Sequence, residues 1–249
     1  MDNAGIRSLN CGSQDYITHL VISCGNPRYG DTHHQRIFLM KSTLLHSLSV
    51  VALATLSHAE PLKVYILAGQ SNMQGYASIT TFDYLAKDPK TAPLLAEMRG
   101  KDGKPTVCER VWISSLARDR SGADAVKEGK LTAGFGARED TIGPEFTFGI
   151  TMEKTHKGPI LLVKTAWGGK NLHTDFRPPS ASSEGAGTYY IKMVDHVKKV
   201  LADPKKTVPD YNAKDGYELA GFVWFQGWND LADKNFYKQR GKSGGYDKY

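Results

Sequence analysis

Four short apolar runs constrain the fold of this 249-residue chain more than any other feature. Each run is rich in Val, Ile, Leu or aromatic residues and has the length of a buried strand. The runs are Val64–Ala68, Val111–Ser115, Ile160–Ala166 and Leu219–Gln226. Between the last two, apolar residues recur at helical spacing over Thr188–Ala202, which predicts an amphipathic helix that ends before Pro204. A second helix is expected to start at Pro144, because proline is favoured in a first helical turn.

Strands that alternate with helices predict an α/β fold, a three-layer sandwich in which helices cover both faces of a central, mainly parallel sheet. Ligands of such sheets bind at the carboxyl ends of the strands. Ser71, the Gly168–Gly169 pair and Gly227 each follow the end of a predicted strand, so we expect their three loops to meet on one edge of the sheet. Ser71 is the candidate nucleophile, because the strand fixes its position and the turn leaves its hydroxyl accessible.

The composition argues against several classes of partner. The net charge of +6 is modest, and the 32 Lys and Arg residues are scattered rather than gathered in a basic stripe, so no nucleic-acid partner is expected. The three cysteines, Cys11, Cys24 and Cys108, lack the C-x-x-C spacing of a metal site, so no metal is predicted from them.

Residues 40–59 have the pattern of a secretory signal peptide. Met40 and Lys41 precede an apolar stretch, and residues 57–59 form a small-x-small cleavage site. The stretch is too short to span a bilayer, so no membrane span is expected, and the alternative is a buried helix. We expect Met40 to be the true start, residues 1–39 to be a disordered upstream extension that is not native, and the mature protein to be secreted or periplasmic.

Three sequence blocks carry the candidate chemistry in the remaining segment, residues 60–249. They are Gly69–Met73 (GQSNM), Gly143–Phe146 (GPEF) and Trp224–Asp230 (WFQGWND). In that order and spacing the blocks resemble the SGNH hydrolase superfamily, and more closely its sialate O-acetylesterase-like branch, carbohydrate esterase family six. The resemblance covers the whole of residues 60–249. It implies a flavodoxin-like SGNH hydrolase fold, an acetylated carbohydrate as substrate and no cofactor.

A serine esterase that removes acetyl groups from sugars, a carbohydrate O-acetylesterase, is the function that this resemblance implies. Ester hydrolysis needs a nucleophile and donors aimed at the developing oxyanion. Ser71 supplies a hydroxyl and its own N–H, and the N–H of Gly143 can be approached closely because no side chain blocks it. The third donor is the amide of Gln226, which the nearer branch favours, or of Asn229, which fits the Gly-x-Asn-Asp of the wider superfamily. Alternatively, Ser71 only caps the following helix.

The base of the family's triad is missing from its expected place. The family carries it in an Asp-x-x-His near the C-terminus, and this chain has no histidine after the third block. We therefore expect an incomplete domain, a fragment without its last strand and helix that is inactive as given unless another group supplies the base. His173, with Asp175 two residues on, could substitute as the base, but a surface loop residue is the expected interpretation. Lys164, at the end of a strand, is expected to have no chemical role.

Two alternatives to a carbohydrate esterase stay open. The first is a non-catalytic carbohydrate-binding protein derived from the esterase fold, in which aromatic side chains stack on sugar rings. The candidates for such stacking are Tyr76, Trp112, Trp167 and Trp228. The second is a lipid-directed esterase, but no long apolar lid segment favours it.

Overall fold

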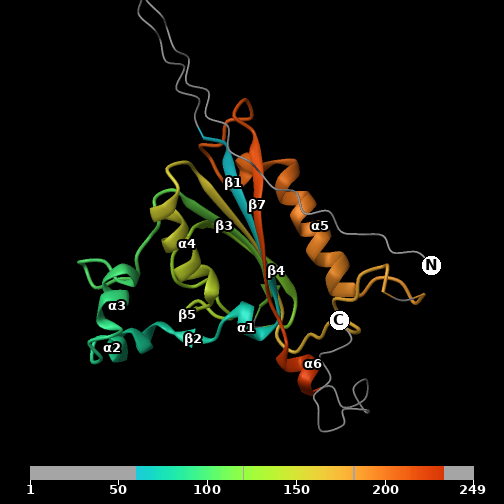
Figure 1. The fold of residues 1–249 in the computed structure, drawn as a ribbon, viewed down its shortest axis with the longest axis horizontal. Helices are drawn as coiled ribbons and strands as arrows, with labels where there is room; N and C mark the ends of the chain where they lie inside the picture. Colours follow the sequence, from blue (N-terminus) through green and yellow to red (C-terminus); the bar gives the residue numbers. More distant parts are fainter. Residues whose placement is uncertain (1–59, 120, 182, 233–249) are drawn as a thin grey trace, which may run out of the picture. The chain divides into compact units, whose positions relative to one another are not determined.

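A five-stranded sheet with the order β4-β3-β6-β1-β7 forms the centre of the molecule, as the computed structural model shows (Figure 1). The structure describes residues 60–119, 121–181 and 183–232. The strands are β1 (Leu62–Gly69), β3 (Val111–Arg118), β4 (Asp124–Lys130), β6 (Ile160–Ala166) and β7 (Tyr217–Phe225). All neighbours pair in parallel except β3 and β4, which are antiparallel. The predicted α/β fold with a mainly parallel sheet is therefore confirmed.

Two long helices cover opposite faces of this sheet (Figure 1). Helix α4 (Pro144–Thr155) packs Phe146 and Ile150 against one face, and α5 (Thr188–Ala202) packs Val200 against the other. Both helices begin where the sequence predicts. The smaller elements are α1 (Ser71–Gln74), β2 (Ala77–Ser78), η1 (Ile79–Thr81), α2 (Phe82–Leu85), α3 (Ala92–Met98), β5 (Thr141–Ile142), η2 (Pro204–Lys206) and α6 (Trp228–Ala232).

The spacing of buried residues explains why α5 forms. Its buried side chains recur every three or four positions, which places them on one face of a helix. These side chains are Tyr189, Met193, His196 and Val200. Pro204 then ends the helical segment, because proline has no N–H to continue it. The amphipathic pattern therefore sets which face of the helix meets the sheet.

Strand β4 does not follow from the apolar pattern. Asp124–Lys130 carries alternating charged residues, and nearly all of them are exposed. The segment extends because it pairs with β3 through a turn in which the Asp119 carboxylate accepts the N–H groups of Ser121 and Ala123. A solvent-facing edge strand needs little apolar content, so the composition gave no signal for it.

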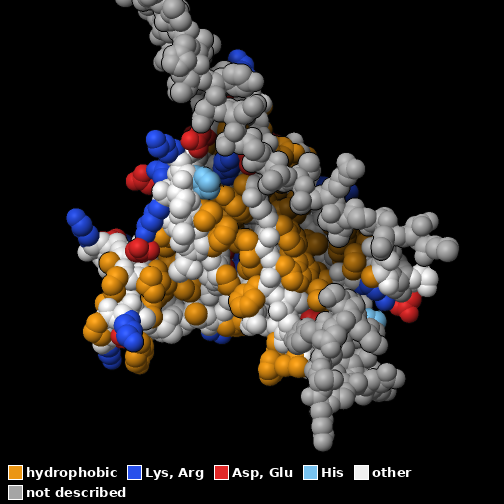
Figure 2. Space-filling view, viewed as in Figure 1, with side chains coloured by type: hydrophobic (Ala, Val, Ile, Leu, Met, Phe, Trp, Pro, Cys, Tyr) orange, Lys and Arg blue, Asp and Glu red, His pale blue; other side chains and the backbone are white. Residues whose placement is uncertain are grey.

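Strand β7 has the composition of an interior strand but lies at the edge of the described sheet. Figure 2 shows hydrophobic side chains gathered over the middle of this face of the molecule. On β7, the exposed members are Tyr217, Leu219, Phe222 and Phe225. A continuous apolar run is typical of a parallel strand that is covered on both faces. The sequence therefore predicts β7 as a strand, although β7 lies at the edge of the described sheet.

Several predictions fall on residues outside the described ranges. The disordered extension (1–39), the signal peptide (40–59) and the chain after Ala232 all lie there. No helix in the described ranges has the length and apolar content needed to cross a bilayer. Within the same ranges, no three His, Cys, Asp or Glu side chains gather in a way that suits a metal ion.

Cys108 is expected to resist thiol reagents while the protein is folded. It is fully buried, and this burial, with Glu153 beside it, raises the pKa of its thiol to about 12. The reactive thiolate is therefore a minute fraction at about pH 8, where an exposed cysteine is partly ionised. Peptide mapping after iodoacetamide treatment should find Cys108 unmodified in native protein and modified in urea. Equal modification in both conditions would contradict the burial.

Candidate active site

Ser71 lies where β1 ends, at the edge of the sheet. The strand stops at Gly69, whose φ of +154° disfavours other residues, and a Cβ there would lie 2.3 Å from the Phe225 carbonyl oxygen. Ser71 is the first residue of α1 and is half-buried. Its hydroxyl forms no hydrogen bond with any described residue, and the N-cap of α1 is Gln70. Ser71 is therefore not the N-cap of this helix, which was the alternative role that the sequence left open.

Gly143 lies beside Ser71, as the sequence predicts for the first two blocks. Both residues line one open hollow of about 410 Å³, together with Tyr76 and Pro144. The two turns meet backbone to backbone, because a Cβ on Gly75 would lie 2.1 Å from the Cα of Gly143. Glycines at both positions therefore allow the hollow to form.

A buried ion pair lies behind Gly143. The N–H of Gly143 donates to Oε1 of Glu145 at 2.9 Å, and Nζ of Lys164 lies 2.6 Å from Oε2 of the same carboxylate. Lys164 also donates to the carbonyls of Gln74 and Phe135, each at 2.8 Å. Burial lowers the pKa of Lys164, and the Glu145 carboxylate acts in the opposite direction. Lys164 was expected to be a strand-end residue with no chemical role; the structure gives it a structural one, because it ties together the loops around Ser71 and Gly143.

The third block reaches the first through Asn229. Its backbone N–H donates to Oε1 of Gln70 at 2.9 Å, and its side-chain amide donates to the same oxygen and, at 3.2 Å, to the carbonyl of Lys170. Nε2 of Gln226 donates to the Lys170 carbonyl at 2.8 Å and to Oδ2 of Asp230 at 2.7 Å. Both side-chain amides therefore hold loops together, and whether either also serves an oxyanion stays a prediction.

The loop after β6 completes the meeting of the three loops. The N–H of Gly168 donates to Oε1 of Gln74 at 2.8 Å. A Cβ on Gly168 would lie 3.7 Å from the Cβ of Ser71. The close approach of Gly168 to Ser71 and the hydrogen bonds from Asn229 to Gln70 together confirm that the loops after β1, β6 and β7 share one edge of the sheet.

Sequence reasoning missed the two buried glutamines that flank Ser71. Gln70 and Gln74 are 0% and 4% exposed, and each uses its side-chain oxygen to hold a neighbouring loop. Nε2 of Gln70 and Oε1 of Gln226 are buried without a hydrogen-bond partner among the described residues. Gln70 and Gln74 lie close to Ser71 in sequence, but only the folded loops show what they bind.

Two of the described histidines have partners other than Ser71. Nε2 of His156 lies 2.9 Å from the Tyr65 hydroxyl, and Nε2 of His196 lies 3.2 Å from Oγ of Ser114. Burial lowers the pKa of His196 and favours its neutral form. His173 is half-buried in the loop after β6 and has a contact of its own.

Asp175, which the sequence placed beside His173, has a structural task. Its Oδ1 lies 3.2 Å from Nζ of Lys170, and its Oδ2 accepts the N–H of Asn171 at 3.1 Å. Its carboxylate therefore closes the loop that it lies in. Within the described ranges, no histidine hydrogen-bonds to the Ser71 hydroxyl, so the base is not identified there.

A family model described as a carbohydrate esterase, sialic acid-specific acetylesterase, matches residues 61–243. Similar solved structures include a protein from Arabidopsis thaliana (18% identity, 69% of this chain and 59% of that chain, TM-score 0.39). A carbohydrate acetylesterase from Xanthomonas citri is also similar (14% identity, 69% of this chain and 33% of that chain, TM-score 0.36). So is NanS (15% identity, 72% of this chain and 57% of that chain, TM-score 0.38). This chain therefore spans less than two thirds of each of these structures. A comparison with curated proteins found no match.

Proposed function

Because this chain belongs to the family of carbohydrate esterases described as sialic acid-specific acetylesterases, we propose that it is a serine esterase that removes acetyl groups from sugar hydroxyls. Ser71 is the proposed nucleophile. We also propose that residues 40–59 direct the protein out of the cytoplasm, to the periplasm or the medium. The sugar and the mechanism are parts of this proposal.

The observation that carries the proposal is the position of the Ser71 hydroxyl. It is half-buried, makes no hydrogen bond to a described residue, and lies in a hollow that is also lined by Gly143. As the first residue of α1, Ser71 has no partner for its N–H within the helix. A free hydroxyl beside backbone N–H donors is the arrangement that acyl transfer requires. Of these donors, the N–H of Gly143 already donates to Glu145.

In the proposed reaction, Oγ of Ser71 attacks the acetyl carbonyl carbon, and the carbonyl oxygen becomes negative. The N–H of Ser71 stabilises this oxyanion, and the N–H of Gly143 does so by sharing its hydrogen between the oxyanion and Glu145. A base takes the proton of Oγ as the bond between Oγ and the carbonyl carbon forms, and no described residue is identified as that base. The C–O bond to the sugar then breaks, the sugar oxygen receives the proton from the base, and an acetyl-enzyme remains. Water hydrolyses the acetyl-enzyme to acetate and restores Ser71.

Acetyl-enzyme formation at Ser71 is the expected result of a direct test. The protein is incubated with acetylated xylotriose or para-nitrophenyl acetate, quenched in acid within seconds, and digested for mass spectrometry. We expect acetate release and one acetyl group on the peptide that contains Ser71. Acetyl groups on lysines alone, at the level of a heat-denatured control, would contradict the proposal.

A non-catalytic carbohydrate-binding protein is the second candidate, favoured by the lack of a described histidine at Ser71. Of the aromatic residues proposed to stack on sugars, Tyr76 and Trp228 are 54% and 63% exposed. Trp112 and Trp167 are buried in the core, so the prediction that they stack on sugars is wrong. Saccharide binding without acetate release would select this candidate.

A further inference from the structure

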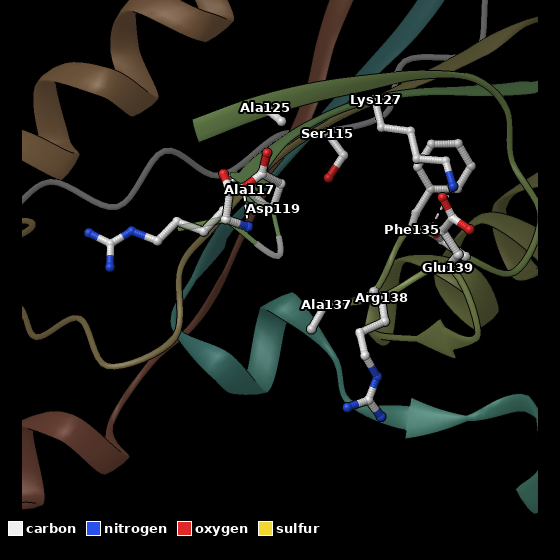
Figure 3. Close-up of a pocket in the computed structure, with 13 residues that line it drawn as sticks. Ser115, Ala117, Asp119, Ala125, Lys127, Phe135, Ala137, Arg138 and Glu139 are labelled. Carbon is white, nitrogen blue, oxygen red and sulfur yellow. Dashed lines mark hydrogen bonds between the residues drawn. The ribbon is translucent and has the colours of Figure 1, made fainter. Parts of the chain in front are cut away.

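A second cavity, of about 550 Å³, opens beside the candidate active site (Figure 3). Its floor is the hairpin of β3 and β4, and its rim is the loop of residues 134–139. The carboxyl end of β3 lies at this cavity, as expected for a ligand site on a parallel sheet. Apolar side chains line part of it, namely Ala117, Ala125, Phe135 and Ala137.

Two polar side chains in the cavity have hydrogen-bonding capacity to spare. The hydroxyl of Ser115 points into the space, although the residue is only 4% exposed, and it forms no hydrogen bond with a described residue (Figure 3). The carboxylate of Glu139 lines the rim and forms no hydrogen bond or ion pair with any described residue. A hydroxyl that opens into a cavity can bind a water there, or a ligand group that replaces that water.

The cations of the cavity already have partners. The guanidinium of Arg118 donates to the Tyr189 hydroxyl. Nε of Arg138 lies 3.3 Å from Asp140. Nζ of Lys127 donates to the Gly134 carbonyl at 2.8 Å, which leaves two of its three hydrogens.

These pairings favour a neutral polyol over an anion. A carboxylate ligand would be repelled by Glu139, and both guanidiniums that line the cavity already donate to a protein oxygen. A sugar hydroxyl both donates and accepts, so it can donate to Glu139 and accept from Lys127, while Ser115 can do either. The apolar part of the lining suits the C–H face of a sugar ring.

The cavity and the Ser71 hollow share a wall. The N–H of Ala137, which lines the cavity, donates to the carbonyl of Gly75 at 2.8 Å, and Gly75 lines the hollow. Gly75 follows Ser71 by four residues, a rise of about 6 Å along a helix. The two spaces therefore lie next to each other, and a ligand that occupied both would cross the wall formed by Gly75 and Ala137.

We propose that this cavity binds a neutral sugar unit of an oligosaccharide whose acetylated unit lies at Ser71. The inference rests on the proposed function and extends it, because it makes the substrate an oligosaccharide rather than a single sugar. Ser115, Lys127 and Glu139 hold the hydroxyls of this unit.

Calorimetry on the full chain with Ser71→Ala tests the site without turnover. The titrants are xylotriose, cellotriose and chitotriose as neutral probes and N-acetylneuraminic acid as an anionic probe. We expect at least one neutral probe to bind, and Glu139→Gln or Ser115→Ala to raise its Kd about tenfold. Lys127→Met should act similarly, whereas Lys130→Met, on the opposite face of the same strand, should leave the Kd unchanged. Thermal melting verifies that each variant is folded.

Three outcomes would overturn the proposal. The first is that no neutral probe binds. The second is that a neutral probe binds and the three cavity variants leave its Kd unchanged. The third is that the anionic probe alone binds. Because the readout is binding, a failure of the esterase proposal would appear separately, as absent acetate release from the wild-type chain. If that chain is active, its kcat/KM should be higher for acetylated xylotriose than for acetylated xylose, and Glu139→Gln should remove the difference.

Discussion

Ser71→Ala is expected to lower kcat for acetyl-ester hydrolysis by about a thousandfold or more, without a change in the folded structure. The hydroxyl would be the atom that forms the new bond, so its removal leaves only the catalysis that backbone donors and substrate binding provide. The same hydroxyl forms no hydrogen bond with a described residue, so its loss leaves no polar partner unsatisfied. Initial rates of acetate release and thermal melting of both proteins check the two halves of this prediction.

Ser180→Ala is a suitable control for that experiment. Ser180 is exposed in a turn of the loop between β6 and α5 and does not line the hollow. Its removal should leave kcat within experimental error of the wild-type value. Equal rates for wild type and Ser71→Ala would reject the proposed nucleophile. A loss of rate with a lowered melting temperature would point to a structural role for the hydroxyl instead.

The parts of the fold that the sequence predicts are those that contact the core. Strands β1, β3 and β6 are buried and apolar, and α5 has one apolar face, so the apolar pattern identifies them. Strand β7 has the same apolar composition, although none of its residues is fully buried in the described sheet. Strand β4 forms because its backbone pairs with β3, and its charged side chains carry no trace of that pairing. A property that depends on a neighbouring strand is not encoded in the local pattern.

The candidate site also has a part that the sequence predicts and a part that it does not. Chain geometry explains why the loops that carry Ser71, Gly168 and Gly227 meet, because each follows a parallel strand and the carboxyl ends of such strands share one edge. Gly143 follows β5, which pairs antiparallel with β2 outside the main sheet, so its approach to Ser71 depends on how that loop folds.

The hydrogen-bond partners of the side-chain amides could not be predicted from the sequence. Asn229 and Gln70 are 159 residues apart, and Gln226 and Lys170 are 56 apart. Such contacts depend on where loops settle to within an ångström, and residue type alone does not determine that.

The Lys164–Glu145 ion pair gives the second large prediction: Lys164→Met should lower the free energy of unfolding by about 3–5 kcal/mol. Methionine fills a similar volume but leaves the Glu145 carboxylate buried without its cation. It also deprives the Gln74 and Phe135 carbonyls of their donor. Urea unfolding at neutral pH, with the slope compared between proteins, measures the loss.

Two comparisons separate the effect of burial from the effect of charge. Lys154 and Glu97 lie at the same 2.6 Å separation, but their side chains are 53% and 43% exposed, so Lys154→Met should cost less than about 1 kcal/mol. In the double variant Lys164→Met/Glu145→Gln no charge remains buried, and the glutamine oxygen can still accept the Gly143 N–H. We therefore expect it to be more stable than Lys164→Met alone. If Lys164→Met and Lys154→Met cost the same, or if the double variant is the less stable, the ion pair does not hold the two turns together.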